Sequence, residues 1–480
     1  MIITIIRGAK IIDGTNSPEF EADVAITKNG RLKVLPSGTA ASAESVIDAK
    51  DLFLAPGFID VHTHDDTNVI RTPDMLNKIS QGITTVIAGN CGISASPVTL
   101  KGEVPNPLNL IGEKKHFIYP EFSDYSSAVE RAQPSVNVAA LIGHTSLRSN
   151  HMDDLYRPAS NSEIKAMKLQ LRNALADGAI GLSSGLAYDT AYEAPKEEVM
   201  KLVEEVADAG GVYTTHMRSE FEPILDAINE AFDTAGHRDV PLIISHLKCA
   251  GAANWGRSDE VLELLKERSK KAQFACDCYP YSASSSNLDL KQVTDKSDIL
   301  ITWSQDYPEQ SNRLLADIAN DWNLSLVDTA KELMPAGAVY YCMSEEDVQT
   351  FLRYERTMIG SDGLPNDPHP HPRLWGAFPR VLGRYCRELK LFDLPEAIHK
   401  MTGKSAKEFG LKDRGVIADD YFADLVLFDF EKVSDRATYQ TPDQPAEGIE
   451  KVWVNGVLSY QNGSEMSGRA GRFLRKGSAN

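Results

Sequence analysis

GFIDVHTH, at residues 57–64, is a short apolar run that ends in polar side chains, and TMIGSDG, at residues 357–363, has the same character. Such runs are typical of barrel strands whose carboxyl ends open onto a site. Six similar runs lie between them: 83–89, 136–144, 179–185, 211–217, 240–246 and 272–280. Amphipathic helical patterns separate most of these runs. The alternation predicts an α/β fold, a (β/α)8 TIM-like barrel with its site at the carboxyl ends of the strands.

The two ends of the chain differ from this middle. Residues 1–54 and 415–480 contain short β-rich runs, with Asn-Gly hairpin signals at 29–30 and 455–456. We therefore predict a small β-sandwich domain built from both termini, beside a barrel over residues 55–414. The segment from about 281 to 346 is too long for a βα loop and has its own helical pattern. It is predicted to be an inserted lid segment at the barrel mouth.

Composition excludes several classes of protein. Of the 480 residues, 42% are hydrophobic and 25% are charged, which is typical of a globular protein with a large core. The net charge of −18 argues against nucleic acid as a partner. No apolar run is long and uninterrupted enough for a signal peptide or a membrane span. The six cysteines are scattered without a C-x-x-C pair, so we expect a reduced, cytoplasmic protein with no membrane partner.

Polar side chains of ligating types follow five of the predicted strands. They are His62, His64, Cys91, His216, His246 and Asp362. Residues i and i+2 of a strand face the same side, so both histidines of the H-x-H motif can reach one ion. Imidazole, thiolate and carboxylate suit Zn²⁺. A single His or Cys at such a position is more often structural, but the joint placement of all six predicts a metal site.

Other polar residues near these strand ends are harder to assign. Prolines flank His369 and His371, so their H-x-H spacing does not aim both rings at one point, and we expect loop residues near the mouth. His144 ends the third strand, and both a pocket role and a structural role stay open. Asp65 and Asp66 are candidates to accept a hydrogen bond from the ring of the preceding histidine.

Longer strings resemble a known family. PGFIDVHTHDD and IGSDG resemble the amidohydrolase superfamily. IAGNCG, GHTSLR, TTHMRSE, ISHLKCAG, YPYSASSS, TMIGSDGLP and HPRLWGAFPRVLG are similar to the N-acyl-D-amino-acid deacylases, the D-aminoacylases. The resemblance extends from about residue 4 to about residue 475. It implies a hydrolase that acts on linear amides.

The resemblance implies a divided metal site. One zinc would be tightly bound by Cys91, His216 and His246. A second, weaker position would be formed by His62, His64 and Asp362, with Asp362 as the catalytic acid and base. Many binuclear amidohydrolases carry a carboxylated lysine after strand four, but AIGLSSGLAY here has none. In the D-aminoacylase subgroup the Cys91 thiolate takes over that position, and the resemblance assigns no role to His144, His369 or His371.

The resemblance also implies substrate contacts. The residues that match the grip on the substrate carboxylate are Lys248, Tyr279, Ser285 and Arg373. A guanidinium with nearby ammonium and hydroxyl donors is a common carboxylate clamp. Tyr188, just past strand four, is a candidate contact to the substrate. Tyr340 and Met343 match an apolar side-chain pocket, with a core role for either left open.

We therefore expect zinc-dependent hydrolysis of an N-acyl-D-amino acid to a carboxylate and a free D-amino acid, with apolar side chains favoured. Three alternatives remain. A deacylase for N-acyl-D-glutamate or N-acyl-D-aspartate would differ only in the pocket. A cyclic-amide hydrolase of the dihydropyrimidinase type is disfavoured by the missing lysine, and a non-catalytic interaction protein is disfavoured by the six intact ligand positions. The expected partner is a small-molecule substrate, and the sequence assigns no oligomeric state.

Overall fold

A computed structural model describes residues 1–463 and 468–478 of the protein. Residues 464–467 and 479–480 belong to the range assigned above to the terminal β domain and lie outside the described residues.

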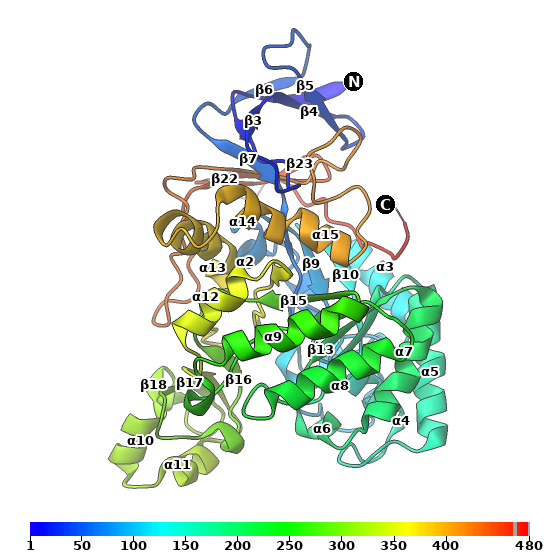
Figure 1. The fold of residues 1–480 in the computed structure, drawn as a ribbon, viewed down its shortest axis with the longest axis vertical. Helices are drawn as coiled ribbons and strands as arrows, with labels where there is room; N and C mark the ends of the chain where they lie inside the picture. The colour runs from blue at the N-terminus through cyan, green and yellow to red at the C-terminus, as the bar shows by residue number, and fades with distance from the viewer. Residues whose placement is uncertain (464–467, 479–480) are drawn as a thin grey trace.

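Parallel strands form the predicted barrel (Figure 1). The strands are β8 (Phe58–Asp60), β9 (Ile83–Ala88), β10 (Asn137–Ala140), β11 (Ile142–Gly143), β12 (Gly181–Gly185), β13 (Val212–His216), β14 (Leu242–Ile244), β15 (Phe274–Cys278) and β20 (Thr357–Ile359). Their order is β8-β9-β10 and then β11-β12-β13-β14-β15-β20. A parallel bridge between Thr63 and Gly363 joins the first strand to the last. The predicted strand at 136–144 is divided into β10 and β11, and every predicted barrel strand is present.

Side chains from alternate positions of these strands fill the barrel interior. The set comprises Ile59, Val61, Ile87, Ala139, Ile180, Val212, Ile243, Ala275 and Met358. Phe409 and Leu474 belong to the same buried cluster. The interior is thus a packed core, as is usual for this architecture, and chemistry is left to the strand ends and their loops.

The predicted helices cover the outside of the barrel. They include α5 (Asn161–Ala176), α7 (Lys196–Ala209), α8 (Ile224–Gly236) and α9 (Ser258–Arg268). Helix α5 begins with a capping box between Ser160 and Glu163. Helix α7 ends at Gly210, which adopts the left-handed conformation that glycine tolerates best. Each of these helices buries one apolar face against the strands.

Two sheets made from both chain ends pack on each other at one end of the molecule (Figure 1). One contains β5 (Leu32–Leu35), β4 (Asp23–Thr27), β1 (Ile2–Arg7) and β6 (Ser45–Asp48). The other contains β23 (Val457–Gln461), β22 (Ile449–Val454), β21 (Leu425–Phe428), β7 (Phe53–Pro56), β2 (Lys10–Ile11) and β3 (Phe20–Glu21). Both Asn-Gly pairs join antiparallel neighbours, β4 to β5 and β22 to β23, as predicted.

The segment after β15 forms a lobe at the other end of the molecule (Figure 1). It contains an antiparallel sheet of β16 (Ser284–Asn287), β19 (Ala336–Tyr340), β17 (Ile299–Ser304) and β18 (Arg313–Leu314), with α10 (Leu315–Trp322) and α11 (Leu326–Leu333). Asn287 donates hydrogen bonds to Asn106 and Asn109 in the loop after β9. The inserted segment therefore contacts a βα loop of the barrel mouth.

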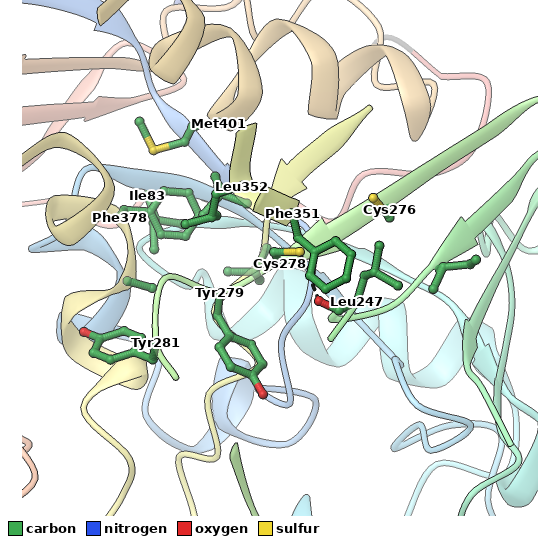
Figure 2. Close-up of a cluster of buried hydrophobic side chains, with 14 of the residues drawn as sticks. Ile83, Leu247, Cys276, Cys278, Tyr279, Tyr281, Phe351, Leu352, Phe378 and Met401 are labelled. Atoms are coloured by element: carbon green, nitrogen blue, oxygen red, sulfur yellow. Dashed lines mark hydrogen bonds between the residues drawn. The ribbon is translucent and has the colours of Figure 1, made fainter. Parts of the chain in front are cut away.

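Between the strands and the outer helices lies a large apolar cluster, part of which Figure 2 shows. Cys276 and Cys278 of β15 lie in it, and the Cys278 thiol contacts the Leu247 carbonyl oxygen. Among the described residues, no helix is both long enough and apolar enough to cross a membrane.

Candidate metal centre

The six predicted ligand residues converge at the carboxyl ends of the barrel strands. One group of ligand atoms comes from His62, His64, Cys91 and Asp362, and another from Cys91, His216 and His246. Within each group the ligand atoms lie within 4.8 Å of one another. The Cys91 thiol belongs to both groups, which places it between the two halves of the cluster.

Short distances link these donors. His62 Nε2 lies 3.2 Å from Cys91 Sγ, and His246 Nε2 lies 3.4 Å from the same sulfur. His246 Nε2 is also 3.0 Å from His216 Nδ1. On the other side, His64 Nε2 is 3.1 Å from Asp362 Oδ1. Ring nitrogens, a thiol and a carboxylate that point toward common positions fit a divalent cation such as zinc.

The backbone is strained at three of these positions. Cys91, His246 and Asp362 have φ values of 54°, 35° and 50°. Residues with a side chain avoid this left-handed region, so such a conformation persists only where the surrounding structure enforces it. Each of the three lies two or three residues after the end of a barrel strand, in the turn that brings its side chain into the cluster. Strain of this kind at three ligand positions supports a functional role for them.

The electrostatics of the cluster favour the ligating forms of its thiol and its carboxylate, and place a proton on the His64 ring that a bound metal would displace. Burial by itself would raise the pKa of the Cys91 thiol, but the His62 and His246 rings hold that pKa well below its ordinary value. Burial would likewise raise the pKa of Asp362, but Arg373 and His64 hold it well below the usual range. Burial would lower the pKa of His64, but contacts with Asp362 and Cys91 raise it to about 9. Thiolate and carboxylate are the forms that ligate metals.

Two carboxylates that sequence reasoning missed orient the histidine rings. Asp277 on β15 lies 3.3 Å from His62 Nδ1 and accepts the backbone N–H of His246 at 2.9 Å. Glu220 lies 2.8 Å from His246 Nδ1. Metal-binding histidines commonly give their second ring N–H to such a carboxylate. The signals were present: Asp277 alternates with two core cysteines, so it faces the barrel interior, and Glu220 follows the strand-end residue His216 by four positions in TTHMRSE.

The expectation for Asp65 and Asp66 is wrong. His64 Nδ1 has no hydrogen-bond partner among the described residues. Asp65 instead pairs with the buried Lys78 ammonium at 3.1 Å, and Asp66 accepts the backbone N–H of Ala95 at 3.3 Å. Both carboxylates therefore have partners other than the His64 ring: an ammonium on the helix Leu76–Ile79 and a backbone N–H in the loop after β9.

The proposed clamp residues gather beside the metal cluster. Arg373 Nη1 lies 3.0 Å from Asp362 Oδ2, and its guanidinium lies 4.6 Å from the centre of the Tyr279 ring. Arg373 also donates to the Ser285 carbonyl oxygen at 3.2 Å. Lys248 contacts Glu220 and lies 5.8 Å from the same tyrosine ring centre. Lys248 and Arg373 are buried, so neither is a solvated surface charge.

The other predicted substrate residues lie around this cluster. The Tyr188 ring centre is 5.0 Å from that of His216. Met343 lines a small cavity together with His246, Lys248 and Tyr279. The Tyr340 hydroxyl is occupied within the inserted segment, because it donates to the Asn287 carbonyl at 3.0 Å and accepts the Asp289 N–H at 2.8 Å.

The three unassigned histidines lie outside both ligand groups. His144 Nε2 lies 2.9 Å from the buried Glu198 carboxylate. His369 Nε2 lies 2.7 Å from the Tyr439 carbonyl oxygen. His371 accepts the Arg373 N–H at 2.9 Å through Nδ1, and its buried ring packs edge-on against Tyr439. These contacts give His144 and His369 structural roles, and His371 supports the backbone of Arg373.

Comparison with known proteins decides the family. Residues 45–274 and 332–460 match the Amidohydrolase family. The chain is 43% identical to D-aminoacylase of Alcaligenes xylosoxydans xylosoxydans, over 99% of this chain and 98% of that one. The chain belongs to the D-aminoacylase family of amidohydrolases. It is therefore an enzyme of the N-acyl-D-amino-acid deacylase group, a metal-binding hydrolase on a (β/α)8 barrel.

Relatives named for other substrates are almost equally similar. N-acyl-D-aspartate deacylase of the same organism is 42% identical, over 99% of this chain and 95% of that one. N-acyl-D-glutamate deacylase from Bordetella bronchiseptica, solved with zinc and a phosphonate mimic of the tetrahedral intermediate, superposes with a TM-score of 0.95 at 40% identity and covers 99% of each chain. Overall similarity to this deacylase family therefore does not distinguish the side chain that is accepted.

Proposed function

We propose that the protein is a zinc enzyme that hydrolyses N-acyl-D-amino acids and favours apolar side chains. The observation that carries this proposal is a set of unused donors beside the metal cluster. The Tyr279 and Ser285 hydroxyls and Arg373 Nε are buried and have no hydrogen-bond partner among the described residues. Buried donors are normally satisfied, so unpaired ones beside a reactive centre point to a ligand that accepts hydrogen bonds. The α-carboxylate of an N-acyl amino acid is such an acceptor.

The proposed tight zinc ligands are Cys91, His216 and His246, and the weaker position is assigned to His62, His64 and Asp362. Bound zinc supplies a Lewis acid that activates water and polarises an amide carbonyl. We assign the proton transfers to Asp362. Its carboxylate accepts a proton from the attacking water and then delivers it to the leaving nitrogen, because an amide anion is a poor leaving group.

The clamp supports a preference for one enantiomer. Lys248, Tyr279, Ser285 and Arg373 would hold the α-carboxylate, while the amide carbonyl lies at the metal cluster. With two substituents of the α-carbon fixed in this way, only one enantiomer directs its side chain into the remaining space.

The side-chain preference rests on the groups that surround that space. Met343 offers apolar surface, and the Tyr340 hydroxyl is already used by the backbone. Lys291, a candidate cation on the inserted segment, pairs with Asp189, and 66% of its side chain is exposed. An acidic substrate side chain would have to displace Asp189 to reach it. Burying an unpaired carboxylate costs several kcal/mol, whereas burying a leucine side chain gains about 1.5–3 kcal/mol.

A substrate panel tests the proposal. N-acetyl derivatives of D- and L-leucine, methionine, phenylalanine, glutamate and aspartate are compared by kcat/KM, with the L-enantiomers as matched controls. We expect D-leucine, D-methionine or D-phenylalanine to exceed D-glutamate at least tenfold. If N-acetyl-D-glutamate is the best substrate and Lys291→Ala abolishes that preference, the acidic alternative is correct.

We also propose a cytoplasmic enzyme whose partner is its small-molecule substrate. All six cysteines are free and buried, as is usual in a reducing compartment.

A further inference from the structure

Glu220 contacts both the metal cluster and the proposed carboxylate clamp. It follows β13 and is 8% exposed. Its Oε1 lies 2.8 Å from His246 Nδ1 and also accepts a hydrogen bond from the Lys248 ammonium. Its Oε2 lies 3.8 Å from His216 Nε2. One carboxylate therefore contacts two candidate zinc ligands and one candidate clamp residue.

His246 Nδ1 lies 2.8 Å from Glu220 Oε1 and 2.8 Å from Lys248 Nζ, and of these two groups only the carboxylate can accept a hydrogen from the ring. When Nδ1 donates its hydrogen to Glu220, the lone pair lies on Nε2. That nitrogen faces Cys91 Sγ at 3.4 Å and His216 Nδ1 at 3.0 Å. A carboxylate at this position thus keeps the ring in the tautomer and the orientation that a metal ligand requires.

The contact with Glu220 also determines where the positive charge of Lys248 lies. Glu220 is the only carboxylate within 4.0 Å of the Lys248 ammonium among residues 1–463 and 468–478. The lysine side chain is only 6% exposed. A buried ammonium without a carboxylate partner is strongly unfavourable, so Glu220 is the group that keeps this charge beside Tyr279. The Ala250 N–H also donates to the Glu220 carbonyl at 2.8 Å, which fixes the loop that carries both His246 and Lys248.

We propose that Glu220 is a positioning residue that links the two parts of the site: it orients His246 for metal binding and holds Lys248 at the substrate carboxylate. The inference rests on the proposed function for the role of Lys248, but the role of His246 can be tested without any substrate.

The first experiment measures zinc affinity. The metal-free protein and its Glu220→Gln variant are titrated with zinc in competition with a chromophoric chelator. Loss of a carboxylate behind a metal-binding histidine typically weakens metal binding by about 10–100-fold, and we expect an effect of that size. The matched control is Glu230→Gln. Glu230 pairs with Arg218, two residues after His216, at 2.7 Å, and it contacts neither His246 nor Lys248. This control is expected to change zinc affinity less than twofold.

The second experiment is a double-mutant cycle at saturating zinc. Lys248→Met is made in the parent and in the Glu220→Gln background, and KM is measured for the best substrate of the panel. If Glu220 holds Lys248 in place, the lysine substitution raises KM at least tenfold in the parent and less than threefold in the variant background. Circular dichroism of all variants checks that the fold is retained.

The outcomes separate this inference from the proposed function. Unchanged zinc affinity in Glu220→Gln, or equal effects of Lys248→Met in both backgrounds, overturns the positioning role. A loss of zinc affinity in a protein that turns over no N-acyl-D-amino acid supports the orientation of His246 and overturns the proposed function.

Discussion

The buried Lys78 ammonium, on α2 (Leu76–Ile79), lies behind the metal cluster and joins two strand ends. It contacts Asp60 at 2.8 Å and Asp65 at 3.1 Å, and all three side chains are fully buried. It also donates to Ser361 Oγ at 2.9 Å. Asp60 in turn accepts the Ser361 N–H at 2.8 Å. This network ties the end of β8, just before His62, to the turn that carries Asp362.

Lys78→Met removes the only lysine or arginine that pairs with these two carboxylates among the described residues. Breaking a buried ion pair by deleting one partner typically costs about 3–5 kcal/mol, because a charge is left buried without compensation. We expect the variant to lose about 4 kcal/mol of unfolding free energy. We also expect kcat to fall about tenfold, because the two strand ends lose their shared contact.

Lys400→Met is the matched control. This lysine is also buried, and it donates to the Tyr354 carbonyl at 2.7 Å. Its carboxylate partner, Glu396, lies 3.4 Å away and is 34% exposed, so water can solvate the charge that remains. The expected loss is about 1–3 kcal/mol, the usual effect of leaving one buried acceptor unpaired. Urea unfolding, followed by tryptophan fluorescence and far-UV circular dichroism, measures both variants. If Lys78→Met destabilises the protein no more than Lys400→Met, the reasoning about the buried network is refuted.

Three further predictions concern the site itself. Cys91→Ala is expected to lose the tight zinc and the activity, because no strand-four lysine replaces the thiolate; elemental analysis with one retained zinc equivalent and near-normal kcat would contradict this. Asp362→Ala is expected to retain the tight zinc while kcat falls about 10²–10⁴-fold; turnover within a few-fold of the parent would make Asp362 a structural carboxylate. Tyr279→Phe is expected to leave the unfolding free energy unchanged, because its hydroxyl has no partner among the described residues, yet to raise KM for the best panel substrate about tenfold. A measurable loss of stability with unchanged KM would exclude the hydroxyl from the clamp.

Most of the fold could be predicted because its signals are local. A barrel strand is a short apolar run, and its polar end is visible in the same eight or nine residues, as in GFIDVHTH. The hairpin turns were equally visible, because Asn-Gly pairs favour the backbone conformation that such turns require. The six candidate ligands followed from the rule that the carboxyl ends of barrel strands meet at one face, which holds whatever the intervening loops do.

The partners of charged residues could not be predicted in this way. Asp65 follows the H-x-H motif directly, yet it pairs with Lys78 rather than with the neighbouring ring. Lys248 was predicted to contact the substrate carboxylate, and no sequence pattern indicated that Glu220 would lie against its ammonium. A local pattern predicts which face of a strand a side chain occupies. Which charged partner it then contacts depends on where distant parts of the chain place their own side chains, and a local pattern does not contain that information.

The sequence by itself therefore determined the barrel, the carboxyl ends of the strands as the place of the site, and the types of candidate ligand residue found there. All three follow from hydrophobic periodicity and strand alternation, which are properties of neighbouring residues. Only the tertiary structure decided how those ligands are held. Lys78 meets Ser361 across 283 residues of chain, and the ligand atoms of Cys91, His246 and Asp362 come together from three separate strand ends. Such contacts depend on the relative placement of distant strands, which barrel closure fixes and which no local stretch of sequence contains.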